Sequence, residues 1–302
     1  RRAGFGASRS ELEEISKNDY EDIVEDLLHP ERFEDLDEDY VKRYNPELSY
    51  HDALGLHAGK WLWRMINTKR PLEEKMALFW HHIFPTAHYK SDHTPSSMAQ
   101  IETFRRNGLS NLKKILLDLS RDPAMNYWLD NCENHSDEPN ENWGRELLEL
   151  FSMGVGNYTE EDIKNAARAF TGWTFEQPLP LYPNGHYETS FIFNANDHDD
   201  SQKTFLGRTG NFNGEDIVEI ICEQRATAKF ISRHIYTFFV EDEPQVHTWS
   251  IEEPNNPDAI NEMIDILMSN DGEIKPLLRF VFNSEFFKNS MFKRVKNPTE
   301  LV

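Results

Sequence analysis

The chain has 302 residues, with 32 Lys and Arg against 53 Asp and Glu, and a formal net charge of −21. This length fits one large domain or two smaller ones, and a hydrophobic content of 38% is enough for a substantial core. The acidic balance argues against a nucleic-acid-binding protein, because such proteins carry a basic face for the phosphates. No run of 18 apolar residues occurs, so the sequence predicts no membrane span.

The two cysteines leave the disulfide state open. Cys132 and Cys222 stand alone, without a CxxC pair, which argues against a cysteine-based zinc site or a redox dithiol. One disulfide and two buried thiols fit the sequence equally well.

The last residues resemble the beginning of a helix. In NPTELV, Asn297 stands at the N-cap, Pro298 at the first helical position and Glu300 at the capping-box position. We therefore expect this chain to be part of a longer protein that continues beyond residue 302.

Helical patterns dominate the first half of the chain. Ser10 and Glu13 predict a capping box before a first short helix, and a second helical pattern runs over 19–28. Residues 31–49 are acidic and contain proline, so we expect a connector there. The hydrophobic periodicity predicts further helices at about 50–67, 71–84, 95–106, 108–121 and 140–153.

The second half contains an irregular insert between helices. Thr159 and Asp162 cap the helix that precedes it, and Asn213 and Asp216 cap the helix that follows. Within the insert, over 171–213, Pro and Gly exclude helix, and TSFIFN is a candidate strand. Helical patterns return at 214–223, 225–240, 257–269 and 273–287. We predict a mainly α fold: a single large multi-helical domain over 1–302 with a loop-rich insert that carries a small β element.

Two glutamates form the first candidate site. Glu146 and Glu149 lie at i and i+3 in NENWGRELLELFSMG, and therefore on one helical face. Paired carboxylates on a helix suit metal ligation or acid–base catalysis, so both are candidate catalytic residues. The helical wheel also places them away from the apolar arc, so a plain solvated face explains them as well.

A histidine in LEEKMALFWHHIF forms the second candidate. His81 borders the apolar arc of this predicted helix, and Glu74 lies seven residues earlier on the same stripe. A half-buried imidazole backed by a carboxylate is oriented for metal ligation or proton transfer. A packed histidine with a satisfied hydrogen bond explains the same pattern, and His82 is expected at the surface.

Three further histidines carry a weaker signal. His88 and His93 follow in a loop, but closeness in sequence is not convergence around a metal. His234 lies centrally on the apolar arc of TAKFISRHIYTFF, and we interpret it as a core residue.

The end of the insert holds the third candidate site. His198, Asp199 and Asp200 offer an imidazole and two carboxylates to one divalent metal. An Asx-rich turn attached to Lys203 fits equally well. The candidate metal ligands are therefore His81, His198 and Asp199. No GxSxG or HExxH motif occurs.

Seven motifs, in this order, resemble the bacterial family known as domain of unknown function 1800 (DUF1800). They are RRAGFGAS, EKMALFWHHIF, SRDPAMNYWLDN, NENWGRELLELFSMGVGNYTEEDI, AARAFTGW, HDDSQKTFLG with GNFNGEDI, and ATAKFISRHIYTFFV. The resemblance implies a largely helical bacterial protein, exported to the periplasm or cell exterior and frequently encoded beside a sulfatase-like companion. It implies no reaction. The family pattern features the NEN–RELLEL stretch, His81 and His198, but it often has His in place of Ile83 and Lys in place of His234.

Two functions remain open. One is an exported metal-dependent enzyme, with a site built from His81, Glu146 or Glu149, and His198 beneath the 171–213 insert. A divalent cation would act there as Lewis acid or activate water. The other is a non-catalytic extracellular binding or assembly protein that works with a secreted partner, favoured by the acidic composition and the aromatic-rich insert.

Overall fold

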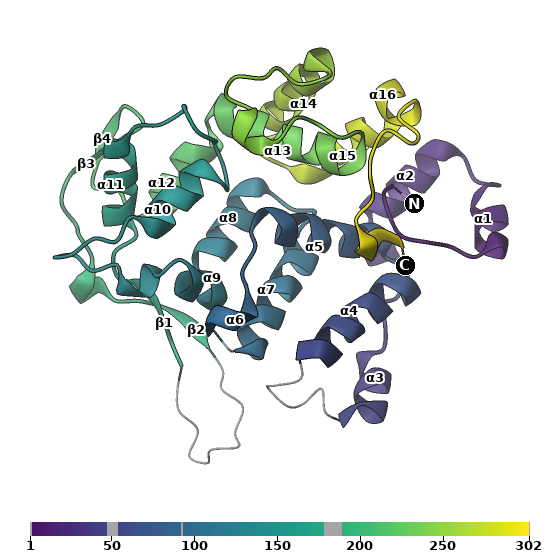
Figure 1. The fold of residues 1–302 in the computed structure, drawn as a ribbon, viewed down its shortest axis with the longest axis horizontal. Helices are drawn as coiled ribbons and strands as arrows, with labels where there is room; N and C mark the ends of the chain where they lie inside the picture. Colours follow the sequence, from purple (N-terminus) through teal and green to yellow (C-terminus); the bar gives the residue numbers. More distant parts are fainter. Residues whose placement is uncertain (1, 47–53, 92, 178–188, 302) are drawn as a thin grey trace.

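The computed structural model describes residues 2–46, 54–91, 93–177 and 189–301, and its architecture is mainly helical (Figure 1). The described part contains sixteen α-helices and two small two-stranded sheets, which confirms the predicted fold class. None of the described helices is both long and apolar enough to cross a membrane.

Ten helices form the N-terminal half. They are α1 (Arg9–Ile15), α2 (Tyr20–Leu28), α3 (Glu38–Tyr44), α4 (Leu54–Asn67), α5 (Pro71–Ile83), α6 (His88–Ser91), α7 (Thr94–Asn107), α8 (Leu112–Ser120), α9 (Pro123–Trp128) and α10 (Asn142–Glu149). The predicted capping box of α1 was two residues off, because Ser8 and Glu11 form it rather than Ser10 and Glu13. The acidic stretch predicted as a connector contains α3, whose side chains are not buried, and α9 was not predicted.

The C-terminal half holds the insert and six more helices. Its elements are α11 (Glu160–Ala169), β1 (Trp173–Glu176), β2 (Ser190–Phe193), β3 (Lys203–Phe205), β4 (Arg208–Gly210), α12 (Gly214–Cys222), α13 (Arg225–Phe239), α14 (Pro257–Ser269), α15 (Ile274–Asn283) and α16 (Glu285–Lys288). The predicted capping boxes of α11 and α12 are confirmed. The helix predicted over 273–287 is two helices, because Ser284 has extended backbone and caps α16 by accepting a hydrogen bond from the Phe287 amide.

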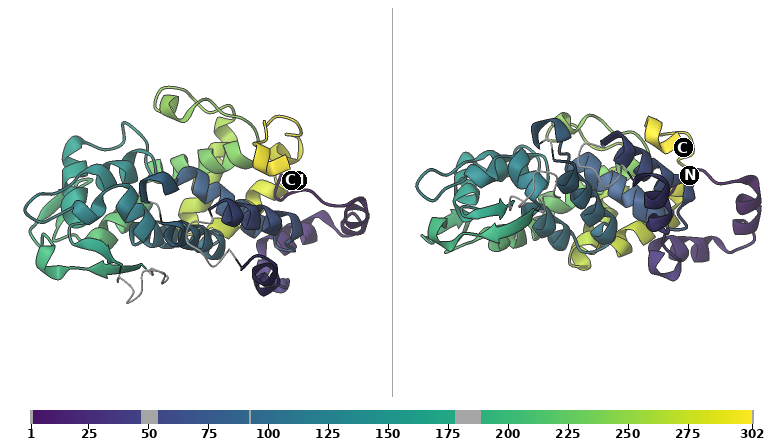
Figure 2. Two further views of the ribbon diagram at one scale, coloured as in Figure 1. Left: turned by 60° about the horizontal axis from the view of Figure 1, so that its bottom comes forward. Right: turned by 90° about the horizontal axis from the view of Figure 1, so that it is seen from below.

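The molecule is elongated. In Figures 1 and 2 the two hairpins lie with α10 to α12 near one end, and α1 lies at the other end. α5, α7 and α8 lie between these ends, and α13 to α15 lie along one side of them. Segments far apart in sequence therefore meet on α5.

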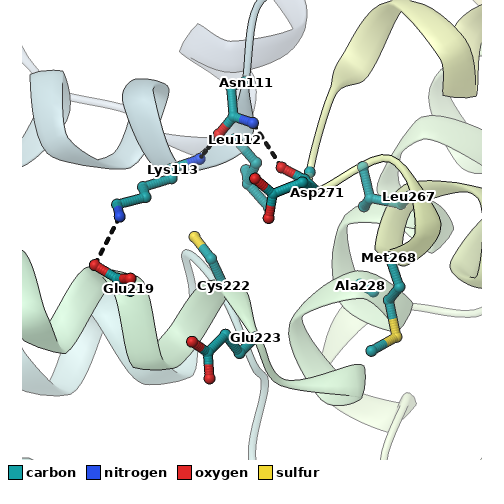
Figure 3. A pocket seen from close by; sticks show the side chains of 11 residues that line it. Asn111, Leu112, Lys113, Glu219, Cys222, Glu223, Ala228, Leu267, Met268 and Asp271 are labelled. Carbon is teal, nitrogen blue, oxygen red and sulfur yellow. Dashed lines mark hydrogen bonds and ion pairs between the residues drawn. The ribbon is translucent and has the colours of Figure 1, made fainter.

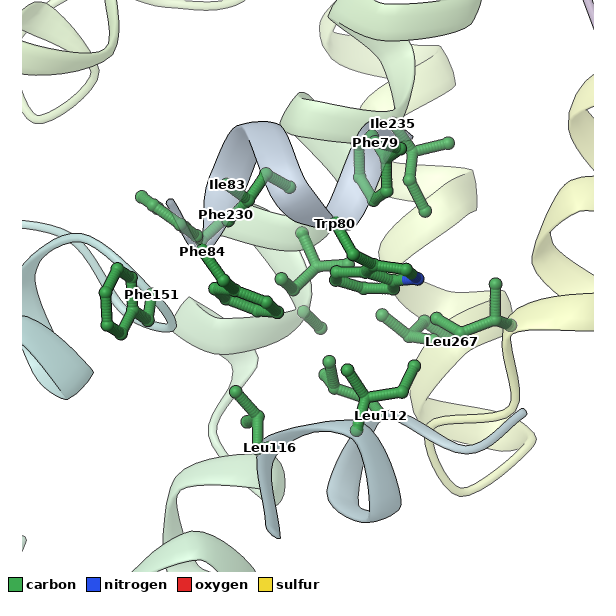
Figure 4. Packing of buried hydrophobic residues seen from close by; sticks show 14 of the residues in the cluster. Phe79, Trp80, Ile83, Phe84, Leu112, Leu116, Phe151, Phe230, Ile235 and Leu267 are labelled. Atoms are coloured by element: carbon green, nitrogen blue, oxygen red, sulfur yellow. The ribbon is translucent and has the colours of Figure 1, made fainter. Parts of the chain in front are cut away.

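α5 runs through the hydrophobic core. Its apolar side chains recur at helical spacing and are buried. Trp80 is fully buried, stacks on Phe84 with ring centroids 5.3 Å apart, and donates its indole N–H to the Gly108 carbonyl at 2.9 Å. Figure 4 shows this α5 cluster with side chains from α8, α13 and α14, among them Leu112, Leu116, Phe230, Ile235 and Leu267. The core thus packs α5 against α13, the helix that lines the pocket described below.

The insert begins with an antiparallel hairpin. β1 pairs with β2, with Trp173 opposite Phe193, and β2 lies in the segment predicted as a strand. Gly172 has φ +76°, and a Cβ there would lie 2.5 Å from the Asn194 carbonyl oxygen, so the chain needs glycine at this close approach. Residues 178–188, which follow β1 in the sequence and precede β2, lie outside the described residues.

Candidate functional site

His81 lies half-buried near the C-terminal end of α5. Its ring packs edge-on against Trp61, with centroids 5.7 Å apart, and burial lowers the pKa of the imidazole. The carboxylate expected behind it has other partners: Glu74 accepts hydrogen bonds from Arg64 Nε and Arg105 Nε, both at 2.7 Å, and from Trp61 Nε1 at 2.9 Å. The expectation that Glu74 orients His81 was therefore wrong. Within the described residues, Nδ1 of His81 is buried without a hydrogen-bond partner.

His198 lies in the insert, away from solvent. Its Nδ1 lies 2.9 Å from the Thr171 carbonyl oxygen, an acceptor, so Nδ1 donates this hydrogen bond and Nε2 is the ring nitrogen left for another partner. Nε2 lies 3.8 Å from a carboxylate oxygen of Asp200, whose side chain is 90% exposed, and the ring packs against Phe193. One imidazole nitrogen and one loose carboxylate make an incomplete set for a metal.

Asp199 has a structural set of contacts. One carboxylate oxygen accepts from Arg168 Nε at 2.7 Å and the other from the Ser201 amide at 2.8 Å, while Lys203 donates to the Asp199 carbonyl. Burial alone would raise the pKa of Asp199, but the hydrogen bonds from Arg168 and Ser201 outweigh it and lower the pKa to about 2. Of the two interpretations of this segment, the contacts match the turn attached to Lys203.

We expect Asp199→Asn to lower the free energy of unfolding by about 1–2 kcal/mol, because it weakens the charge-assisted bond to Arg168 in a partly buried turn. Asp200→Asn, on the exposed neighbour, is the control and should change stability by less than about 0.5 kcal/mol. Urea denaturation of the two variants checks this. Equal losses of unfolding free energy in the two variants would show that the contacts of Asp199 stabilise the protein no more than those of exposed Asp200.

Glu146 and Glu149 both lie half-buried on α10, so neither stands on a fully solvated face. Within the described residues, Oε2 of Glu146 is buried without a hydrogen-bond partner, and burial, with Glu149 nearby, raises the pKa of Glu146. Glu149 accepts a hydrogen bond from the Tyr158 hydroxyl at 3.3 Å. Glu149 lines the pocket described below, and Glu146 is not among the residues that line it.

The other histidines have separate surroundings. His82 is exposed, as predicted. His234 lies between Phe230 and Trp249, at centroid distances of 4.5 and 4.7 Å, and burial lowers its pKa to about 3, so it is a neutral packed residue as interpreted. His88 pairs with Thr94, and His93 caps α7 through Ser96.

The predicted metal ligands do not form one cluster. Across residues 2–46, 54–91, 93–177 and 189–301, no three His, Cys, Asp or Glu side chains group closely enough to hold a metal ion. The geometry thus offers no donor set to which a divalent metal can be assigned.

A pocket of about 540 Å³ opens where α10 ends. We call it the α10–α13 pocket; it is lined by side chains of 149–157, of one face of α13 and of 245–250. Gly154 has φ +77°, and a Cβ there would lie 3.3 Å from the Phe230 ring, so glycine lets the loop lie against α13. The loop belongs to the NEN–RELLEL motif and α13 to the ATAKFISRHIYTFFV motif, so two motifs of the sequence meet here.

Three exposed apolar side chains, which we call the apolar rim, line this pocket together with polar and charged side chains. Leu150, Val155 and Val246 line it with 48%, 55% and 40% of their surface exposed. Contiguous exposed apolar groups around a concavity are typical of a binding site. Lys229 and Arg233 lie one helical turn apart on the face of α13 that lines the pocket.

Arg233 is only 1% exposed although it lines the pocket. Its Nη2 donates to buried Glu243 at 2.8 Å, its Nη1 to the carbonyls of Trp249 and Glu252, and its guanidinium stacks over Trp249 at 4.5 Å. Its Nε has no hydrogen-bond partner in the described part of the chain. A buried guanidinium N–H without a partner is unusual, but this nitrogen has almost no accessible surface and is therefore closed to a ligand in the pocket.

Lys229, Arg233 and Trp249 were not predicted from the sequence as site residues. The only available signal was that Lys229, Phe230 and Arg233 follow at i, i+1 and i+4 beside the apolar arc of α13. This signal was weak, because Trp249 and Glu243 reach Arg233 from a separate segment that no periodicity connects to α13.

A second pocket, of about 310 Å³, lies between α8, α12 and α14 (Figure 3). Lys113 and Glu219 form an ion pair at 2.7 Å at its edge, and Cys222 lines it. Both cysteines are free thiols, which settles the disulfide question, and burial raises the pKa of Cys222 to about 12. A thiol of that pKa is protonated at neutral pH and a poor nucleophile.

Comparison with known proteins identifies the family alone. No curated protein and no solved structure matches the chain. The family described as Protein of unknown function (DUF1800) matches residues 1–302, and the chain therefore belongs to this family.

Proposed function

We propose that this chain is a binding protein that takes a small amphipathic organic ligand in the α10–α13 pocket. The observation that carries the proposal is the combination, in one concavity, of an exposed apolar rim with the charged side chains of Glu149 and Lys229. An apolar surface with a few placed polar groups is the usual composition of a ligand pocket.

The size and contents of the pocket support this proposal. Its volume of about 540 Å³ falls within the range of roughly 300–1,000 Å³ that small-molecule sites occupy. The rings of Phe230 and Trp249 form part of its lining and would contribute contact area to an apolar ligand. Glu149 and Lys229 would fix the orientation of its polar groups.

The proposal belongs to the second of the two function classes considered from the sequence. The metal-dependent enzyme gains no support, because His81, Asp199, His198 and the α10 glutamates do not form a joint donor set in the described residues. Export and a sulfatase-like companion stay predictions from the family resemblance.

Occupancy of the pocket can be tested with phenylnaphthylamine, an uncharged aromatic probe whose fluorescence rises in apolar surroundings. We expect the native protein to bind one equivalent, and Leu150→Asp to weaken binding at least tenfold, because it places a charge on the apolar rim. The matched control is Leu12→Asp on α1, at the far end of the molecule, since Leu12 is 51% exposed against 48% for Leu150.

Calorimetric titration provides the stoichiometry, and circular dichroism shows that both variants are folded. Binding that survives Leu150→Asp, or that Leu12→Asp weakens equally, would contradict the location of the site. A native protein that binds no equivalent of the probe would contradict the proposed function.

A further inference from the structure

We propose that residues 33–46, which include α3, form a strap that closes a pocket between α4 and α7 and opens without unfolding of the rest of the molecule. Ion pairs with α4 hold the strap closed, so its opening depends on ionic strength. The pocket shares no lining residue with the α10–α13 pocket, and this inference does not rest on the proposed function.

The strap has no buried side chain to attach it. None of residues 33–46, all of which the structure describes, is buried, and the apolar side chains of Phe33, Leu36 and Val41 are only half-buried. α3 itself has seven residues, and isolated helices of that length are unstable in water. The persistence of α3 therefore depends on polar contacts with the rest of the molecule.

Two carboxylates of the strap make these contacts with α4. Glu38 accepts from Lys60 Nζ at 2.5 Å and, with its other oxygen, from Arg64 Nη1 at 2.7 Å. Asp35 accepts from Arg64 Nη2 at 3.0 Å. Burial alone would raise the pKa of Glu38, but Lys60 and Arg64 outweigh it and lower the pKa, so this carboxylate is charged at neutral pH.

The strap begins at a different kind of attachment. Arg70, the residue before α5, donates from Nε and Nη2 to the Phe33 carbonyl at 2.9 and 2.6 Å. This acceptor is a backbone group without a net charge, so salt screens the bond less than it screens the carboxylate pairs. We therefore expect opening to start beyond Phe33, with α3 moving away from α4.

The strap forms one side of a pocket of about 260 Å³. Glu38 lines it from the strap, Lys60, Trp61 and Arg64 line it from α4, and five side chains of α7 complete it. Figure 1 shows α3 at the edge of the molecule, next to α4. Opening of the strap would expose this pocket and the amine of Lys60, whose side chain is 19% exposed in the closed state.

Opening leaves no buried charge without a partner. Arg64 is 4% exposed, but its Nε donates to buried Glu74 at 2.7 Å, a bond that does not involve the strap. The strap carboxylates are more accessible, with Asp35 49% and Glu38 28% exposed. Ion pairs with such partly exposed groups are weak and are screened by salt, so the strap can open at a lower cost than the core.

Hydrogen exchange measured by mass spectrometry tests the opening. We expect the amides of α3 to exchange at least a hundredfold faster than those of α13 in the native protein. Their exchange should be about tenfold faster in 1 M than in 0.1 M NaCl, equivalent to about 1.4 kcal/mol, because the screening length falls from about 10 Å to about 3 Å.

Two neighbouring residues in the first turn of α3 provide matched variants. Glu38→Gln should speed α3 exchange about tenfold in 0.1 M NaCl and remove most of its dependence on salt. Asp39→Asn is the control, because its side chain is 75% exposed and pairs only loosely with Lys42, at 4.0 Å, within α3. It should change α3 exchange by less than twofold.

Acetylation of Lys60 reports on the pocket itself. Asp35→Asn weakens the strap through Arg64, whereas the carboxylate bonded to Lys60 is that of Glu38. An amine-acetylating reagent should therefore label Lys60 at least threefold faster in Asp35→Asn than in the native protein. Lys114 on α8, with 51% of its side chain exposed, is the control and should be labelled equally in both.

Several results would overturn the inference. Equal exchange rates in α3 and α13 would show that the strap opens only when the whole protein unfolds, and exchange of α3 at the rate of an unfolded peptide would show that it is never closed. Exchange that neither salt nor Glu38→Gln changes would show that ion pairs do not hold the strap. Unchanged labelling of Lys60 in Asp35→Asn would show that the pocket stays covered.

Discussion

Replacing Glu74 by Ala should remove about 2–4 kcal/mol from the free energy of unfolding, since it takes the shared carboxylate from two buried arginines and leaves them only more exposed partners. Glu74 is fully buried on α5, while Arg64 comes from α4 and Arg105 from α7, so one carboxylate connects three helices. Its second oxygen accepts from Trp61. Urea denaturation of the purified variant measures this loss. If the loss exceeds the stability of the protein, the variant accumulates only as unfolded protein.

Two further variants locate the origin of this effect. Glu74→Gln keeps the shape but removes the charge, and it should retain the bond from Trp61 while still destabilising the protein. Glu102→Ala removes an exposed partner of Arg105 and should have an effect below about 1 kcal/mol. A loss for Glu74→Ala no larger than that for Glu102→Ala would contradict the central role of the buried carboxylate.

Replacing Glu300 by Gln should lower the free energy of unfolding by about 2–3 kcal/mol at pH 7. Glu300 is fully buried and accepts from both terminal nitrogens of Arg294, at 2.8 and 2.5 Å, and from Lys75 on α5. Burial alone would raise the pKa of Glu300, but Arg294 and Lys75 outweigh it and lower the pKa to about 2. Burial also lowers the pKa of Lys75, to about 8, so both partners of this pair remain charged at pH 7.

The sign of the pH dependence follows from the lowered pKa of Glu300. Its carboxylate contributes stability that is full above the unfolded pKa of about 4.3, and that is lost as the pH falls toward about 2. The difference in unfolding free energy between native protein and Glu300→Gln should therefore be constant from pH 7 to about 5 and shrink below that. Urea denaturation at several pH values checks this, with exposed Glu285→Gln as the control. A difference that does not depend on pH would contradict the assignment.

Local patterns determined much of the secondary structure correctly. The capping boxes at Thr159 and Asn213 are confirmed, and Asn297 and Glu300 form the reciprocal hydrogen bonds expected from NPTELV. These features join residues three apart along the chain, so predicting them requires no knowledge of tertiary contacts. The same reasoning misplaced the cap of α1, where two Ser–x–x–Glu pairs overlap within six residues.

Tertiary structure decided which carboxylates are available for function. Glu74 and His81 share a helical stripe, yet Arg64 and Arg105 occupy Glu74 from two other helices. Asp199 stands beside His198 in sequence, yet Arg168, 31 residues earlier, holds its carboxylate. A helical stripe or a triple of residues predicts which groups could meet, but the strongest partner in space takes them, and that partner is distant in sequence.

From the sequence alone came the helical class, most helix positions, the strand in the insert, the exposure of His82 and the family resemblance. Only the tertiary structure brought the loop after α10 against α13 and placed Trp249 and Glu243 around Arg233. The physical reason is that periodicity and capping act within one or two turns of chain. A pocket instead depends on which faces of separate elements pack together, and those contacts span more than seventy residues between Gly154 and Phe230.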